Sequence, residues 1–177
     1  MTSNCLPIGV VWLKRDLRLL DHAPLAYALK HHKYVLLLYI MEDSLRKEPH
    51  FSSRHLDFIK QSLTDLNKQL VALNTRVLAV EGEVITMLNR LNLRFQIEAL
   101  YSHYETGIGL TYARYKKMKK WSKQKRILWK EFSQQGVFRG LKHRKKWLFE
   151  WTKLMNEPLH PFPEEKKFIS IQYINKI

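Results

Sequence analysis

The sequence has only one cysteine, Cys5, and it lacks any apolar run as long as the roughly 18 residues that a membrane-spanning helix needs. One cysteine excludes an internal disulfide and any metal site built from several cysteines. The N-terminus has neither the basic start nor the small-residue cleavage site of a secretory signal. We therefore expect a cytoplasmic protein with no membrane partner.

Signatures of common nucleotide-binding and hydrolytic sites are missing too. The chain contains no Walker A loop, no Gly-x-Gly-x-x-Gly motif and no Ser-His-Asp order. Its histidines show no spacing with carboxylates that is typical of metal ligands, so we expect no metal site. His103, two residues before Glu105, is the most notable of them. We interpret it as a core or loop histidine.

Acidic residues are almost absent from residues 112–146. This stretch contains 14 basic residues and only Glu131 on the acidic side, whereas residues 1–111 carry a net charge of +2 and residues 147–177 are neutral. Nearly all of the formal net charge of +15 therefore lies in one segment. The segment predicts an electropositive surface and makes a phosphate-bearing partner plausible.

Short apolar runs alternate with segments of helical periodicity along the chain, whose 177 residues suit one domain with a continuous core. The alternation predicts an α/β fold with a doubly wound, five-stranded and mostly parallel sheet, Rossmann- or flavodoxin-like, with helices on both faces. We expect strands at 8–13, 34–41, 75–82, 95–103 and 126–132, and helices at 22–32, 53–73, 83–91 and 106–124. Three prolines between Pro158 and Pro163 favour a linker or extended arm over 158–177, outside the sheet, after a domain of residues 1–157.

Charged residues follow directly on the first strand, in the stretch KRDLRLLDH (14–22). In open α/β sheets, ligands bind beyond the carboxyl ends of the strands, so this loop is a candidate ligand contact. The alternative is a local Asp–Arg bridge from Asp16 that locks the loop, with Lys14 pointing into water. Asp21 is placed to cap the next helix.

The stretch VVWLKRDLRLLDHAPLAYAL resembles the N-terminal signature of the DNA photolyase and cryptochrome family, with His22 in place of the usual Asn. The residues that fit are Trp12, Lys14, Arg15, Asp16, Leu17, Arg18, Leu19 and Asp21. The resemblance continues through the helix from Ser53, the stretch RVLAVEGE, and the segments YSHYETGIGLTYARYKKMKKW and GVFRGLKHRKKW, which are similar to the prokaryotic branch. It covers about residues 8–165.

The resemblance implies the N-terminal α/β domain of a deoxyribodipyrimidine photolyase, which repairs pyrimidine dimers in DNA with light and FAD. FAD would lie in a helical domain that this chain does not contain, so we expect no catalytic residue here. The implied partners are DNA and that helical domain. The implied roles of this domain are those of a scaffold and of an antenna site for a folate or a deazaflavin.

The resemblance also implies which residues matter. Arg15 and Glu105 are the polar antenna candidates, and Gly107 and Gly109 would let a flat ring approach the backbone. The alternative for Glu105 is a place in the first turn of the next helix. The motif residues Trp12, Asp16, Arg18 and Asp21 would hold the loop and the inner architecture. Arg114-Tyr115 stands where the family has Arg-Asp.

Five lysines of the basic stretch are candidates for a nucleic-acid surface: Lys116, Lys117, Lys119, Lys120 and Lys123. The alternative is an amphipathic helix that packs an aromatic face on the sheet and exposes its lysines by default. Two other functions stay open for the chain as a whole. One is the domain of a cryptochrome-type blue-light receptor, and the other is a stand-alone basic nucleic-acid-binding module.

Overall fold

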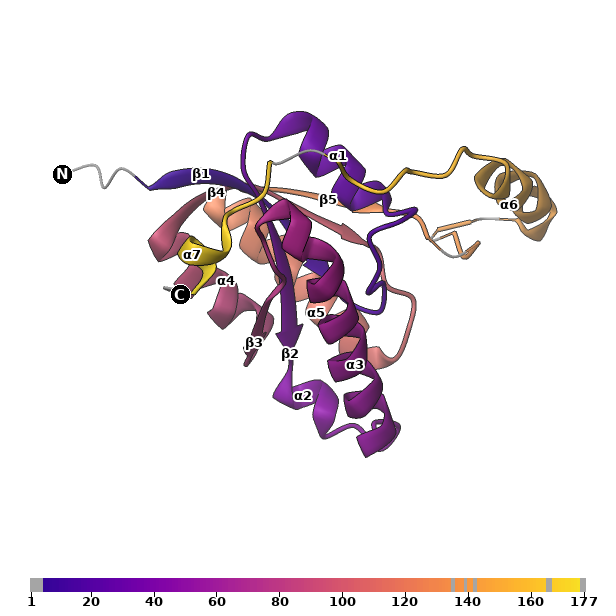
Figure 1. The fold of residues 1–177 in the computed structure, drawn as a ribbon. Coiled ribbons are helices and arrows are strands. Elements are labelled where there is room, and N and C mark those ends of the chain that lie inside the picture. Colours follow the sequence, from indigo (N-terminus) through magenta and orange to yellow (C-terminus); the bar gives the residue numbers. More distant parts are fainter. Residues whose placement is uncertain (1–4, 135, 139, 142, 165–166, 176–177) are drawn as a thin grey trace.

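The computed structural model describes residues 5–134, 136–138, 140–141, 143–164 and 167–175. All five strands of the sheet run parallel, in the order β3-β2-β1-β4-β5 (Figure 1). Their bounds are Leu6–Leu13 (β1), Val35–Met41 (β2), Leu78–Glu81 (β3), Phe95–His103 (β4) and Leu128–Phe132 (β5). The predicted doubly wound sheet is confirmed, and its order is that of the Rossmann fold rather than of flavodoxin.

Helices cover both faces of the sheet, as predicted. α1 (Ala23–His31) and α3 (Ser53–Leu70) pack on one face, and α4 (Val84–Arg94) and α5 (Gly109–Lys125) pack on the other. Shorter helices are α2 (Asp43–Arg46), α6 (Trp147–Met155) and α7 (Ile171–Ile174), and two 3-10 turns span 71–73 and 144–146. None of the helices in the described residues is long and apolar enough to cross a membrane.

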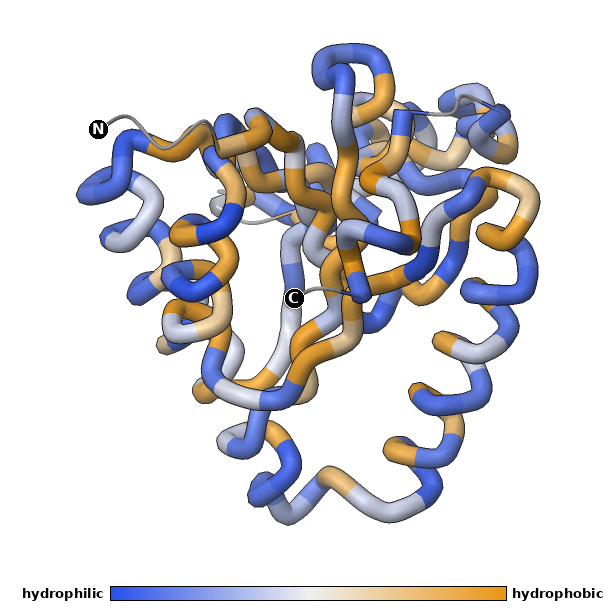
Figure 2. Tube along the Cα trace, turned by 60° about the vertical axis from the view of Figure 1, so that its left-hand side comes forward, coloured by the Kyte–Doolittle hydropathy of each residue, from blue (hydrophilic) through white to orange (hydrophobic). Residues whose placement is uncertain are grey.

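Strand side chains divide between two cores because alternate residues point to opposite faces. On β2, Leu36 and Leu38 pack toward α4 and α5, whereas Leu37 packs toward α1 and α3. In Figure 2 hydrophobic stretches gather toward the middle of the trace, and the outer helices alternate between hydrophobic and hydrophilic residues. The register of β4 against β1 shifts between Ile97 and Ala99, so that Glu98 is an extra residue in β4.

The sheet has a topological switch point between β1 and β4. The chain passes from β1 to β2 and β3 on one side, and then returns to β4 on the other side of β1. Loops that leave neighbouring strands in opposite directions open a crevice at the carboxyl edge of such a sheet. The loops after β1 and β4 therefore flank the place where a ligand site is expected.

The segment after residue 157 runs back along the domain. The amide of Asp21 donates to the carbonyl of His160 (2.8 Å), and Phe168 forms a single parallel bridge with Val35 at the start of β2. Ile169 and Ile174 are buried in the core beside α4. The predicted extended arm therefore packs on the domain in its last part, because its apolar residues complete the hydrophobic core.

Candidate functional site

A cleft of about 650 Å³ opens at the carboxyl edge of the sheet. Its floor and walls come from the ends of β1 and β2, from α3, and from the loop between β4 and α5. Aromatic and apolar side chains make up much of the wall, among them Trp12, Tyr39, Phe51, Phe58 and Ile108. The cleft lies at the switch point, and its size and apolar lining suit a flat organic ligand.

Polar side chains enter this cleft as one connected network, which we call the Arg114 network: Glu42, Arg114, Glu105 and Arg15. Arg114, on α5, donates from one nitrogen to Glu42 and from another to Glu105. Glu105 also pairs with Arg15, at 3.0 Å between Nε and Oε1. Arg15 is 62% exposed in its side chain, whereas the other three are largely buried.

The electrostatics of the Arg114 network are uneven. Glu42 stands one residue past the end of β2, and its burial raises its pKa to about 7 even though Arg114 acts in the opposite direction. Burial likewise raises the pKa of Tyr39 to about 12, so this cleft residue keeps its hydroxyl proton. The cleft therefore offers carboxylate acceptors at its base and the exposed guanidinium of Arg15 near its mouth. A ring with N–H donors and an anionic tail matches this pattern.

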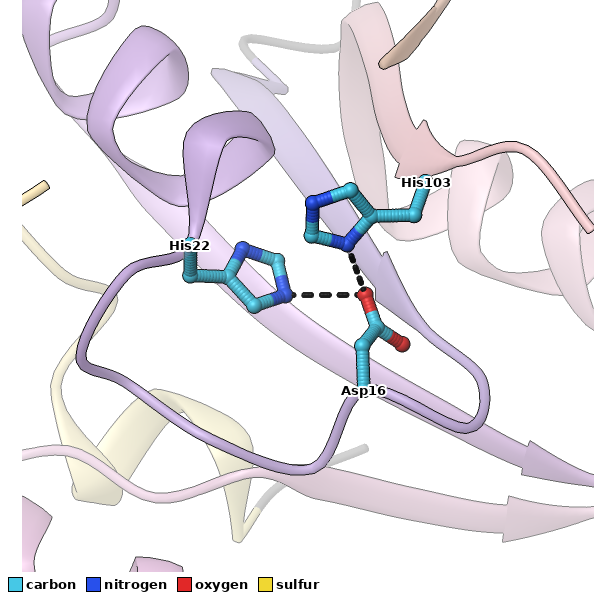
Figure 3. A group of neighbouring side chains, drawn as sticks. All are labelled: Asp16, His22 and His103. Atoms are coloured by element: carbon cyan, nitrogen blue, oxygen red, sulfur yellow. Dashed lines mark hydrogen bonds and ion pairs between the residues drawn. The ribbon is translucent and has the colours of Figure 1, made fainter. Parts of the chain in front are cut away.

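A second polar group lies under the loop after β1, and we call it the Asp16 cluster: Asp16, His22 and His103 (Figure 3). One oxygen of Asp16, Oδ2, accepts from His22 Nε2 (2.9 Å) and from His103 Nδ1 (2.6 Å). The other oxygen, Oδ1, accepts from the amide of Lys14 (2.7 Å). All three side chains are buried. The cluster thus ties together the end of β1, the start of α1 and the end of β4.

Two histidines and a carboxylate so close together also raise the possibility of a metal site. His22 Nδ1, however, accepts the amide N–H of Leu25 at the start of α1 (3.1 Å). A neutral imidazole carries only one proton, so His22 Nε2 must be the protonated nitrogen and has no lone pair for a metal. These bonds favour a closed hydrogen-bonded cluster over a metal centre.

The charge of the Asp16 cluster is set by its hydrogen bonds. Burial alone would raise the pKa of Asp16, but the hydrogen bonds from His103 and His22 outweigh burial and hold that pKa well below its usual range. Burial lowers the pKa of His103 despite the neighbouring carboxylate. At neutral pH the cluster therefore holds an ionised Asp16 that accepts from His22 and from a neutral His103.

Two predictions for the loop after β1 are wrong. Within the part of the chain that the structure describes, Asp16 pairs with no arginine, because its oxygens accept from the two histidines and from the amide of Lys14. The local Asp–Arg pair of this loop is formed by Arg18 and Asp21 instead: Arg18 Nη2 lies 3.8 Å from Asp21 Oδ2 and donates to the carbonyl of Asp21 (2.9 Å). The residue that caps α1 is His22, not Asp21, which has a left-handed backbone with φ of 52°.

The prediction that Lys14 points into water is also wrong. Its side chain is only 9% exposed, and Nζ donates to the carbonyl of His103 (2.8 Å) and lies 3.9 Å from Glu131. Burial lowers the pKa of Lys14 to about 8, although Glu131 counteracts part of this effect. The ammonium nitrogen lies over the indole of Trp12, 4.4 Å from the ring centroid. Lys14 is therefore part of the packed edge of the sheet.

The structure supports some of the four antenna candidates, Arg15, Glu105, Gly107 and Gly109, better than others. Glu105 lies in the loop before α5 and not in its first turn, because that helix begins at Gly109. Arg15 and Glu105 do meet at the cleft. A methyl group added at Gly107 would lie 3.0 Å from Thr111 Oγ1, whereas one at Gly109 would find open space. The geometry therefore gives a steric reason for glycine at Gly107 and none at Gly109. Ligand contact by these residues stays a prediction.

The basic helix follows the amphipathic pattern in part. Met118 and Trp121 are buried against the sheet, but Tyr112 is 55% exposed. The five candidate lysines all lie on the exposed side of α5: Lys116, Lys117, Lys119, Lys120 and Lys123. The burial of Met118 and Trp121 fits the amphipathic interpretation, and a nucleic-acid role for the exposed lysines stays a prediction.

Sequence reasoning missed Glu42 and undervalued Arg114 and His22. Glu42 follows directly on the apolar run at 34–41, so the rule that identified residues 14–22 as a ligand-facing loop would also have found it. Arg114 drew notice only through its neighbour Tyr115. No local pattern identifies the Asp16 cluster, because Asp16 and His103 are 87 residues apart.

Comparison with known proteins agrees with this architecture. The family model for DNA photolyase matches residues 9–146, and no curated protein matches the sequence. Among solved structures, an archaeal photolyase from Sulfolobus tokodaii is similar with a TM-score of 0.75 and 21% identity, over 97% of this chain and 41% of that one. That structure holds two FAD molecules, with the implication of a novel light-harvesting cofactor.

Two further structures have the same fold. A bacterial class III photolyase from Agrobacterium tumefaciens has a TM-score of 0.73 and 19% identity, over 96% of this chain and 36% of that one. A cryptochrome from Synechocystis has a TM-score of 0.74 and 20% identity, over 96% of this chain and 38% of that one. The chain thus spans about two fifths of the length of these proteins.

Proposed function

The chain belongs to the DNA photolyase family, and we propose that it serves as the α/β antenna-type domain of a light-driven, FAD-dependent photolyase that repairs pyrimidine dimers in DNA. The flavin chemistry belongs to the helical domain with which such a domain works. Residues 1–157 form the domain in this proposal, and 158–177 begin the linker toward the helical domain. Phe168 and Ile169 pack into the core, so the proposed linker stays bound to the domain over these residues.

The role of the domain itself is to hold a light-absorbing chromophore in the cleft beside the Arg114 network. The observation that carries this proposal is the coincidence of three features at the switch point: an apolar cleft, two carboxylates joined by Arg114, and an exposed arginine. A folate or deazaflavin ring presents N–H groups, from which Glu105 and Glu42 can accept hydrogen bonds. The anionic tail of either ligand would then face Arg15.

Chromophore binding is tested by titrating the purified chain separately with a methenylated tetrahydrofolate and with a deazaflavin, following the absorption and fluorescence of the ligand. We expect saturable binding of one of them, and competition between the two if both bind. Glu105→Gln keeps the shape of the side chain and removes its charge, so it is the matched variant. Absence of binding by both ligands at neutral pH would contradict an antenna role.

The exposed lysines of α5 supply a second, assisting role, in attracting the phosphate backbone of DNA. The support is the segment at 112–146, with 14 basic residues against one acidic residue, and the exposure of its lysines on one helix. Such contacts are independent of base sequence and weaken with salt. They would assist lesion binding by the helical domain rather than replace it.

The test is duplex binding at several salt concentrations by a variant that carries glutamine at the five candidate lysines. We expect weaker binding and a shallower dependence of log K on log salt, by about 0.9 for each phosphate that the variant no longer neutralises. The matched control carries glutamine at five exposed lysines outside α5, namely Lys30, Lys33, Lys47, Lys60 and Lys68. An equal weakening in both variants would reduce the role of α5 to net charge alone.

A further inference from the structure

Trp12 is an unexpected residue in the wall of a cleft proposed to hold an excited chromophore. It is only 2% exposed, at the end of β1, and lines the cleft beside Lys14 and Arg114. An indole next to an excited flavin or pterin ring is an electron donor. If Trp12 gave one electron to such a ring, its indole would become a radical cation, and return of the electron would restore both molecules and release the excitation as heat.

Two positive charges contact this indole. Lys14 Nζ lies 4.4 Å from the ring centroid of Trp12, and Arg114 Cζ lies 5.1 Å from it. A cation at this distance stabilises the neutral ring through its quadrupole and destabilises the radical cation through Coulomb repulsion. Both effects make the loss of an electron from Trp12 less favourable.

The two cations are fixed in place. Lys14 donates to the carbonyl of His103 and lies near Glu131, and Arg114 is bound by Glu42 and Glu105. Both side chains are largely buried, so water and salt screen their charges only weakly. The carboxylates offset part of the positive field, but the cations are the groups in contact with the ring.

Other aromatic rings continue from Trp12 toward the surface. Trp129 lies 6.5 Å from Trp12 between ring centroids, Tyr115 lies 5.6 Å from Trp129, and Tyr112 lies 6.2 Å from Tyr115. Cations lie near these rings as well, because Lys14 Nζ is 5.8 Å from the centroid of Trp129 and Lys116 Nζ is 4.6 Å from that of Tyr112. Trp12 is the ring of this series that Lys14 and Arg114 both contact, and it is the one that lines the cleft.

We propose that Lys14 and Arg114 suppress electron transfer from Trp12 to an excited ring in the cleft, and thereby preserve the excitation for transfer to a second chromophore. The proposal rests on the proposed antenna function and adds to it an excited-state role for two residues. It accounts for the burial of Lys14, which neither a role in holding the loop nor a contact with phosphate explains. The ammonium serves as a fixed charge beside the indole.

A covalent probe tests this proposal without any bound chromophore. Bimane, a fluorophore that indole quenches by electron transfer, is attached in turn to Phe58→Cys and Ile108→Cys, both in a chain that carries Cys5→Ser. Both positions line the cleft, and Phe58 is 70% exposed, so its replacement should not disturb the core. The readout is the fluorescence lifetime of bimane.

Lys14→Met should shorten the bimane lifetime at least at one label position, by about twofold or more, because it removes a charge in contact with Trp12. Lys14→Arg keeps the charge and should leave the lifetime unchanged. Adding Trp12→Phe to Lys14→Met should restore the long lifetime, since phenylalanine is not a comparable electron donor. A general loosening of the cleft would affect the double variant as much as the single one.

An unchanged lifetime in Lys14→Met at both labels would overturn the proposal, and so would a short lifetime that persists after Trp12→Phe. Because the label is covalent, these outcomes are independent of ligand binding. Failure of the folate and the deazaflavin to bind contradicts the proposed function instead, and the two failures are therefore distinguishable.

Discussion

The Asp16 cluster and the Arg114 network lie at the same edge of the sheet and use the same kinds of side chains, but they differ in access to solvent. Asp16, His22 and His103 are sealed beneath the loop after β1, whereas the Arg114 network faces the cleft and ends in the exposed Arg15. The sealed group joins three backbone segments. The open group keeps charged atoms where a ligand can reach them.

The two regions also hold their carboxylates in opposite states. Asp16 accepts three N–H donors, and these hold its pKa well below the usual range against the effect of burial. Glu42 has a guanidinium partner, and burial prevails there, so that its pKa rises to about 7. A buried carboxylate is thus fixed as an anion by enough donors, and it is close to its titration point with too few.

The largest effect should follow from breaking the sealed region. Asp16→Asn removes the charge and turns one acceptor into a donor, which leaves a histidine N–H without an acceptor. We expect a loss of about 3 kcal/mol in the free energy of unfolding, measured by urea denaturation. The control is Asp21→Asn, a change of the same atoms at a half-exposed neighbour that pairs loosely with Arg18, which should cost about 0.5 kcal/mol or less. Equal losses in the two variants would mean that the Asp16 cluster adds no more to the free energy of unfolding than Asp21 does.

The open region should respond in binding rather than in stability. Glu105→Gln should weaken chromophore binding about 10- to 100-fold, because a charge-assisted hydrogen bond to the ring is removed. The unfolding free energy should fall by only about 1 kcal/mol, because the amide oxygen of the glutamine can still accept from Arg114 although the site is largely buried. The two quantities come from ligand titration and urea denaturation of the same preparation. A large loss of stability without loss of affinity would assign Glu105 to the scaffold.

The pH dependence of stability should have opposite signs in the two regions. The pKa of Asp16 is lower in the folded than in the unfolded chain, so its contribution is complete above about pH 4 and is lost as the pH falls below that value. The pKa of Glu42 is higher in the folded chain, so stability falls as the pH rises from about 4.5 toward about 7.

Two variants separate these slopes in urea denaturation across the pH range. Asp16→Asn should flatten the acid limb, and Glu42→Gln should flatten the decline between about pH 4.5 and 7. Each variant should leave the slope of the other region unchanged. A Glu42→Gln profile identical to that of the parent protein would show that the carboxyl group of Glu42 does not titrate in that interval.

A smaller effect should follow from His22→Asn. Asparagine can still cap α1 through its side-chain oxygen, but its shorter side chain gives up the bond to Asp16. We expect a loss of about 1 kcal/mol, against about 2 kcal/mol for His22→Ala, which loses the cap as well. Thermal or urea denaturation of the two variants checks this order, and equal losses would contradict the capping role of His22.

The fold was largely predictable, because parallel strands that are covered on both faces leave continuous apolar runs. Ile8–Leu13 and Val35–Ile40 are such runs, and the helix from Ser53 shows its three- and four-residue steps openly. The extra residue Glu98 in β4 was not predictable, since its position depends on the register against β1. The start of α5 at Gly109 was missed because the loop before it contains residues that a helix also accepts.

The candidate site was predictable only where the chain itself places residues at a strand end. Arg15 and Glu105 follow β1 and β4 directly, so topology alone brings them to one edge. The partners of Asp16 depend on side-chain reach across the sheet, which no spacing in the sequence records. Lys14 shows the same limit, because its aliphatic stem allows either burial or exposure and only packing decides between them.

The most direct test of the account compares Glu105→Gln and Asp16→Asn in one pair of measurements, chromophore affinity and unfolding free energy. We predict that Glu105→Gln loses affinity at least tenfold but only about 1 kcal/mol of stability, whereas Asp16→Asn loses about 3 kcal/mol of stability. Unchanged affinity in Glu105→Gln, measured with a ligand that the parent protein binds, would contradict the assignment of the cleft beside the Arg114 network as the chromophore site.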